Sequence, residues 1–166
     1  MEKNKFYSYL IKSHLLIFVG FFFFLHFIVQ LPFLCFDFDT SEDVLNNSTV
    51  DLLEENGEVV VLYWTVLFAP FFETFFFQFS IIKIFRLISR RAWVMFFIAI
   101  PLSAVLFSIG HPYSVYYQVA AFFIGLVYAI AFFIGMYRKD LPAFLLVFII
   151  HSSWNLFAFI MEELTV

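Results

Sequence analysis

Five apolar stretches divide this sequence, and each is long enough to cross a membrane as a helix. They cover residues 13–36, 58–82, 92–110, 115–137 and 141–161. A helix needs about 17–25 mainly apolar residues to span a hydrocarbon core of about 30 Å. Apolar residues make up 64% of the chain, and a water-soluble fold of this size has too little interior to bury them. The sequence therefore predicts an all-α, polytopic transmembrane bundle of about five helices in a lipid bilayer.

The basic residues predict how these helices are oriented. All nine Lys and Arg residues fall in three segments: Lys3, Lys5 and Lys12; Lys83, Arg86, Arg90 and Arg91; Arg138 and Lys139. With five spans the three segments share one side, which is the cytoplasmic side because basic residues are retained there. Residues 37–57 are acidic and contain no basic residue, so we expect them outside, together with the C-terminus. The N-terminus is therefore expected inside. Three or four helices would instead put basic segments on both sides.

The remaining composition narrows the partners and the organisation of the chain. The net charge is −4 and no basic stripe occurs, which argues against nucleic acid as a partner. The single cysteine, Cys35, excludes an internal disulfide and a multi-cysteine metal site. We expect residues 1–57 to form a tail, the first helix and the acidic external loop. Residues 58–166 are expected to form the core of an integral membrane protein of a bacterial plasma membrane.

A few polar side chains inside the predicted helices are the candidate functional groups. Glu73 is the one acidic residue well within a span, where a charge costs about 2.5–3.5 kcal/mol or more. His111 ends the third span, while His151 and Asn155 lie four residues apart on one face of the fifth. If these four side chains converge, they supply a carboxylate base, two imidazoles and an amide donor for hydrolysis. The alternative is a set of interhelical hydrogen bonds, which is also our expectation for His26 in the first span.

Three short motifs occur in order on successive core helices: Glu73-Thr74-x-x-x-Gln78, Phe107-x-x-x-His111 and His151-x-x-x-Asn155. Over about residues 58–160 they resemble the CAAX protease and bacteriocin-processing (CPBP) family of intramembrane proteases. The resemblance implies an endopeptidase in which Glu73 and His111 activate a water molecule, with an oxyanion site at His151 and Asn155. It implies a peptide or prenylated-peptide substrate. Glu73, His111 and His151 would bind Zn²⁺ if a metal is used, and a metal-free glutamate mechanism fits the same residues.

The first motif departs from the family pattern Glu-Glu-x-x-x-Arg. Thr74 and Gln78 stand where the family has its second Glu and its Arg. Losing one charge alone would leave the other unpaired in a low dielectric, at a cost of several kcal/mol, whereas losing both leaves the net charge unchanged. We therefore expect a hydroxyl–amide hydrogen bond between Thr74 and Gln78. Both residues, with Phe107, are expected to support the site.

The depth of the candidate residues poses a geometric problem. At about 1.5 Å per residue, Glu73 and His151 lie at similar depths, and His111 lies about 10 Å farther from the cytoplasmic side. Two arrangements would reduce this mismatch. Either the second helix continues into the segment 83–91, or the third helix is tilted.

Competing functions are distinguished by their chemistry. One alternative is a catalytically silent relative that acts as a membrane partner or immunity protein. Another is a small proton or ion carrier that uses Glu73 and the histidines as a relay. Other intramembrane protease types have no support, because no His-Glu-x-x-His motif, intramembrane Asp pair or Gly-x-Ser-x-Gly element occurs. We interpret Ser103 and Ser108 as helix-packing residues.

Overall fold

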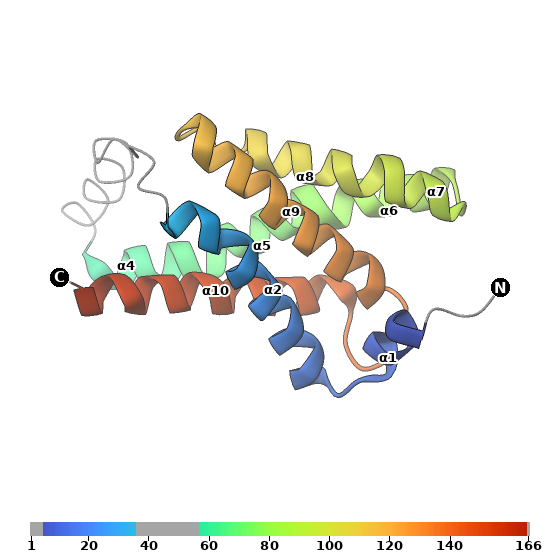
Figure 1. The fold of residues 1–166 in the computed structure, drawn as a ribbon, viewed down its shortest axis with the longest axis horizontal. Coiled ribbons are helices and arrows are strands. Elements are labelled where there is room, and N and C mark those ends of the chain that lie inside the picture. Colours follow the sequence, from blue (N-terminus) through green and yellow to red (C-terminus); the bar gives the residue numbers. More distant parts are fainter. Residues whose placement is uncertain (1–4, 36–56, 166) are drawn as a thin grey trace.

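The long apolar stretches of the chain form a bundle of crossing helices (Figure 1). The computed structural model describes residues 5–35 and 57–165, and every regular element within these ranges is helical. The label η marks a stretch of π-helix, in which the N–H of residue i bonds the carbonyl of residue i−5. The elements are α1 (Lys5–Lys12), α2 (Leu15–Cys35), α4 (Glu58–Tyr63), η1 (Trp64–Phe68), α5 (Ala69–Glu73), η2 (Thr74–Ser80), α6 (Ile81–Ile88), α7 (Ala92–Val94), η3 (Met95–Ala99), α8 (Ile100–Ile109), α9 (Val115–Gly135) and α10 (Ala143–Thr165).

Within the described residues, five helices are long and apolar enough to cross a membrane, which confirms the predicted bundle. They cover Leu15–Phe33, Val59–Ile88, Ala92–Ile109, Val115–Gly135 and Ala143–Met161. Their outer surfaces carry large apolar side chains that water would not tolerate in such number, and lipid is the solvent that suits them. The most exposed include Leu16, Leu87, Ile88 and Phe97. The chain is therefore an integral membrane protein. The predicted acidic loop lies outside the described residues, apart from Gly57.

The structure differs from the sequence prediction at two places near the basic segments. The second span continues as α6 to Ile88, six residues beyond the predicted end at 82. Because of this continuation Glu73 lies about 22 Å of helix from that end, against about 28 Å between Ala92 and His111. The predicted depth mismatch of about 10 Å is therefore reduced to about 6 Å. The second difference is α1, a separate short helix in the segment that was expected to form a tail.

Helix α9 lies at the centre of the bundle and packs against α8, α10 and α2. Small residues allow the close approach to α8. A Cβ atom added to Gly125 would lie 3.0 Å from the Cα atom of Ala104 and 3.2 Å from the Cβ atom of Phe107. A side chain at position 125 would therefore push α8 away. The close packing matters because α8 carries Phe107 and leads directly into the turn that holds His111.

The described basic segments meet at one end of the bundle, on the right of Figure 1. The guanidinium group of Arg86, in α6, lies 5.7 Å from the ring centroid of Tyr137, after α9. The same ring contacts Tyr7, in α1, at 6.0 Å. Contacts thus join the three segments that the charge pattern had placed together. We call this the basic end.

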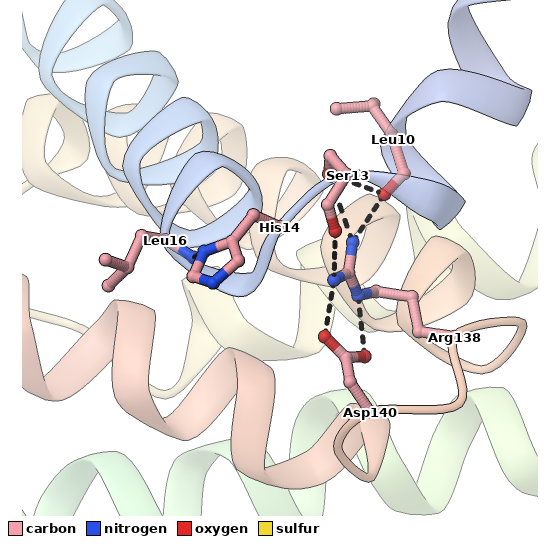
Figure 2. Close-up of polar contacts among 6 residues, drawn as sticks. All are labelled: Leu10, Ser13, His14, Leu16, Arg138 and Asp140. Atoms are coloured by element: carbon pink, nitrogen blue, oxygen red, sulfur yellow. Dashed lines mark hydrogen bonds and ion pairs between the residues drawn. The ribbon is translucent and has the colours of Figure 1, made fainter.

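Arg138 ties α1 and the start of α2 to the connection between α9 and α10 (Figure 2). Its guanidinium group donates to the carbonyl of Leu10 at 2.5 Å and to that of Ser13 at 2.7 Å. It also forms two hydrogen bonds with the carboxylate of Asp140. The side chain is buried and lies over the ring of Phe18 at 4.6 Å. The hydrogen bond from Arg138 holds the pKa of Asp140 below its usual range.

Replacing Arg138 with alanine is expected to lower the free energy of unfolding by about 2–4 kcal/mol, because charge-assisted hydrogen bonds to two backbone carbonyls are lost. The contribution of the Asp140 contact is present above the unfolded-state pKa of that carboxyl and is lost as the pH falls through its lowered folded-state pKa. Unfolding in detergent micelles measures both effects. The matched control is Lys139→Ala, an exposed neighbour, which should change stability by less than about 0.5 kcal/mol. Equal effects of the two substitutions would contradict this account.

Candidate active site

Glu73, His111 and His151 come together from three different parts of the bundle. Glu73 is the last residue of α5, His111 lies in the turn between α8 and α9, and His151 lies in α10. One carboxylate oxygen, Oε2 of Glu73, is 3.6 Å from the Nε2 atom of His111 and 3.6 Å from that of His151. Their side chains are 25%, 14% and 6% exposed, respectively. Three of the four side chains that were expected to converge are therefore together, while their chemical roles remain predictions.

The hydrogen bond of His111 to the backbone determines which of its two ring nitrogens carries the hydrogen, and hence the character of the nitrogen that faces Glu73. Nδ1 lies 2.7 Å from the carbonyl oxygen of Phe107, and a carbonyl can only accept, so Nδ1 carries the hydrogen. Burial lowers the pKa of His111, opposed by that same hydrogen bond. In the neutral ring Nε2 therefore carries no hydrogen and presents a lone pair, so it is an acceptor. It faces a carboxylate oxygen across 3.6 Å, which is longer than a hydrogen bond, and a donor such as water can bridge two acceptors placed in this way.

The turn that holds His111 is fixed on both sides. The hydroxyl of Ser108 donates to the carbonyl of Gln118 at 2.6 Å, and that of Ser114 accepts from the N–H of Tyr117. Ser103 donates to the carbonyl of Phe77 at 2.8 Å, which joins α8 to η2. Both serines that the sequence analysis interpreted as packing residues, Ser103 and Ser108, thus link helices.

His151 has the opposite chemical character. It is buried, its ring packs 4.6 Å from that of Tyr128, and its Nδ1 atom has no hydrogen-bond partner. An unpartnered acceptor is tolerated more often than an unpartnered N–H, so we place the hydrogen of the neutral ring on Nε2. His151 then presents a donor to the space beside Glu73, whereas His111 presents an acceptor.

The arrangement of Glu73, His111 and His151 does not fit a bound metal ion. Within the described parts of the chain, no group of three or more His, Cys, Asp or Glu side chains is arranged to hold one. A metal-binding histidine nearly always donates its second ring N–H to an acceptor. His111 does so to Phe107, but the buried Nδ1 atom of His151 has no such acceptor. We therefore assign no step to Zn²⁺.

Asn155 makes a contact that the sequence does not predict. Its amide nitrogen donates to the backbone carbonyl of Thr65 at 2.8 Å. That carbonyl is available because Thr65 lies in η1, where the N–H of Ala69 bonds the carbonyl of Trp64, five residues earlier. The next bond of this pattern would join residue 70 to Thr65, and Pro70 has no N–H to make it. An amide carries two N–H donors, so one remains for another acceptor.

Thr74 and Gln78 are buried, but the expected hydrogen bond between them is wrong. The Thr74 hydroxyl and both polar atoms of the Gln78 amide have no hydrogen-bond partner. The prediction assumed α-helical geometry, in which residues i and i+4 are stacked on one face. Both residues instead lie in η2, where the backbone pairs residues five apart. The hydroxyl of Ser80 shows the same spacing, because it donates to the carbonyl of Phe75.

The first membrane helix also contributes to the surroundings of His151. His26, in α2, forms a hydrogen bond with the hydroxyl of Tyr128 at 2.9 Å and another with Gln30 at 3.0 Å. Its ring stacks on that of Trp154, with 3.9 Å between the centroids. The expected interhelical bond of His26 is therefore present. Tyr128 was missed, although a tyrosine in the middle of an apolar span was the available signal.

Comparison with known proteins places this arrangement in a family. A family model described as type II CAAX prenyl endopeptidase Rce1-like matches residues 55–157. These residues make up more than half of the chain and include Glu73, His111, His151 and Asn155. A comparison with curated proteins gave no match, and neither did a comparison with solved structures. The chain belongs to the Rce1-like family of type II CAAX prenyl endopeptidases.

Proposed function

We propose that this protein is a membrane-embedded endopeptidase that hydrolyses a peptide bond with a water molecule activated by Glu73 and His111. The family it belongs to consists of membrane proteases. One observation carries the assignment of residues: a single carboxylate oxygen lies 3.6 Å from two imidazoles of opposite hydrogen-bonding character. The proposal includes a peptide or prenylated-peptide substrate, a core formed by residues 58–166, and a bacterial plasma membrane as the location.

In the first step, water donates one hydrogen bond to Glu73 and one to the Nε2 atom of His111. As the oxygen of this water attacks the peptide carbonyl carbon, its proton moves to the Glu73 carboxylate and a C–O bond forms. General-base catalysis of this kind contributes about 10²–10⁴-fold. The product of this step is a tetrahedral intermediate with a negatively charged oxygen.

In the second step, the Nε2–H group of His151 and the free N–H of Asn155 donate to that oxyanion. Preorganised donors of this type are each worth about 10²–10³-fold in rate. The Asn155 amide is held by the Thr65 carbonyl, so it needs little reorganisation. The intermediate collapses, the C–N bond breaks, and the proton on Glu73 passes to the leaving amine. Glu73 is thereby returned to its carboxylate form.

A cleavage assay with purified protein tests the proposal. Farnesylated and unmodified peptides ending in a CAAX sequence, together with longer membrane-inserted peptides, serve as substrates. His111→Ala and His151→Ala are each expected to lower kcat by about 10²-fold or more, because each removes a polar group beside the reacting atoms. The control is His14→Ala, which replaces an exposed histidine at the basic end. Cleavage that survives both site substitutions would overturn the mechanism.

Replacing Pro70 with alanine tests the role given to Asn155. Alanine restores an N–H that the helix can pair with the Thr65 carbonyl, and Asn155 then loses its acceptor. We expect kcat to fall about tenfold, with KM and the thermal midpoint unchanged or the midpoint raised. Pro101→Ala is the matched control, because Pro101 follows the similar π-helical stretch η3. If both substitutions change kcat equally, the Thr65–Asn155 contact has no role in positioning.

The neutral pair at positions 74 and 78 gives a specific reason to consider a second function. A silent relative would keep the polar cluster for stability and act by binding another membrane protein. Such a protein cleaves none of the substrates above and loses no partner binding when His111 is replaced with alanine. A proton carrier would instead support a proton flux across the membrane of liposomes that contain it, and replacing Glu73 with glutamine would abolish that flux.

A further inference from the structure

A cavity of about 460 Å³ opens at the basic end of the bundle, and we call it the basic-end cavity. It is lined by residues 11–13, where α1 ends, and by residues 137–140, in the connection between α9 and α10 (Figure 1). The helix α2 begins at Leu15, α9 ends at Gly135 and α10 begins at Ala143. The cavity therefore lies just beyond the ends of three membrane helices, at the level where lipid headgroups meet water.

Arg138 lines this cavity, but its hydrogen-bonding capacity is used up within the protein (Figure 2). A guanidinium group has five N–H donors. Two of them pair with the carboxylate of Asp140. The other three reach the carbonyls of Leu10 and Ser13 and the hydroxyl of Ser13. Arg138 therefore fixes the two chain segments relative to each other, and Asp140 balances its charge.

Two further cations line the cavity, one from each segment. Lys12 is the last residue of α1, and Lys139 directly follows Arg138. Both lysines are exposed, and neither forms an ion pair with another residue that the structure describes. Three cations and one carboxylate give the lining a net charge of +2. An anion bound between the two lysines would offset their mutual repulsion.

The surroundings of the cavity favour a lipid over a soluble anion. The described residues of the basic end include eight Lys and Arg side chains, and Asp140 is the one carboxylate among them. Ile11 and Tyr137 add apolar surface to the lining, which a soluble phosphate does not need and a phospholipid does. Exposed aromatic side chains, Phe6 and Tyr9, lie along α1, as is typical of a helix at the membrane surface. Basic pockets between membrane helices on the cytoplasmic side bind anionic lipid headgroups.

We propose that the basic-end cavity binds the phosphate group of an anionic phospholipid, with Lys12 and Lys139 as the hydrogen-bond donors. By the positive-inside rule, this lipid belongs to the cytoplasmic leaflet. Arg138 acts as a positioning residue, because it holds the two segments that present the lysines. A lipid bound to both segments joins α1 to the α9–α10 connection. The proposal is independent of peptide cleavage and of the residues assigned to it.

Native mass spectrometry of the protein released from micelles tests the site by counting bound lipids. Phosphatidylglycerol is expected to bind as one saturable adduct, and more tightly than phosphatidylcholine, which has no net charge. Lys12→Gln and Lys139→Gln should each weaken this binding about fivefold. Lys5→Gln is the matched control, because it removes the same charge from an exposed position of α1 outside the cavity. It should weaken binding less than about twofold. Equal effects of all three substitutions would mean that total charge attracts the lipid, and the proposal would be wrong.

Thermal unfolding in micelles separates a lipid from a soluble phosphate. A ligand that binds only the folded protein raises the unfolding midpoint. Phosphatidylglycerol is expected to raise the midpoint of the wild type but not that of the double variant Lys12→Gln/Lys139→Gln. In detergent alone the two midpoints should agree, which shows that the double variant is folded. Inorganic phosphate should leave the wild-type midpoint unchanged. An equal rise with inorganic phosphate would overturn the assignment to a lipid, and no rise with phosphatidylglycerol would overturn the site itself.

Discussion

Replacing Glu73 with glutamine is expected to lower the rate of peptide cleavage by about 10³-fold or more, with the fold intact. Glutamine has nearly the same shape but cannot take a proton from water, so the general-base contribution of about 10²–10⁴-fold is lost. The amide also presents an N–H where Oε2 now faces two imidazole nitrogens at 3.6 Å. The measurement is kcat for a peptide substrate, with the thermal unfolding midpoint recorded on the same preparation.

The stability readout makes this experiment decisive. Burying an ionised carboxylate is costly, so its replacement by a neutral amide should leave the unfolding midpoint unchanged or raise it. A large fall in midpoint would instead mean that the carboxylate holds the helices together. Glu73→Asp provides the matched control. It keeps the base but withdraws it by one methylene group, and we expect part of the activity to remain. Full activity in Glu73→Gln would exclude Glu73 as the base.

Much of the fold could be predicted because its cause is local in the sequence. Runs of apolar residues specify membrane helices, since only internally hydrogen-bonded backbones are stable in lipid. The three basic segments predicted which helix ends lie together, and contacts such as that of Arg86 with Tyr137 show them meeting. The site was predictable for a similar reason. Glu73 and His151 are polar groups in apolar helices, and His111 follows the end of another. Convergence places these polar groups beside one another instead of beside lipid.

The features that escaped prediction depend on irregular backbone. Nothing in the sequence around Thr65 shows that its carbonyl is free to accept a hydrogen bond from a side chain. The carbonyl is free because a π-helical stretch is followed by Pro70, which has no N–H. The same irregularity in η2 separates Thr74 from Gln78. Helix periodicity assumes 3.6 residues per turn. The assumption fails in the second span, which contains both the general-base candidate and the support for the oxyanion site.

Introducing one charge at position 74 or 78 is expected to destabilise the protein more than any other substitution considered above. Thr74→Glu and Gln78→Arg each put a charged group at a position that is 0% exposed. A buried charge without a partner costs about 3–5 kcal/mol. We expect each single variant to be produced poorly and to unfold at a much lower denaturant concentration than the wild type.

The double variant Thr74→Glu/Gln78→Arg introduces the charged pair of the family pattern. It should recover most of the stability that either single variant loses, because the longer Glu and Arg side chains can meet where the Thr and Gln side chains do not. The measurement is a double-mutant cycle of the free energy of unfolding in micelles, with an expected coupling of about 2–3 kcal/mol. Thr74→Val with Gln78→Met is the matched apolar control. It should be neutral or stabilising, because it removes buried polar atoms that have no partner. If the two charges instead destabilise additively, positions 74 and 78 are independent sites. The neutral residues of this chain would then not be a substitute for an ion pair, and the π-helical geometry of η2 would be the reason.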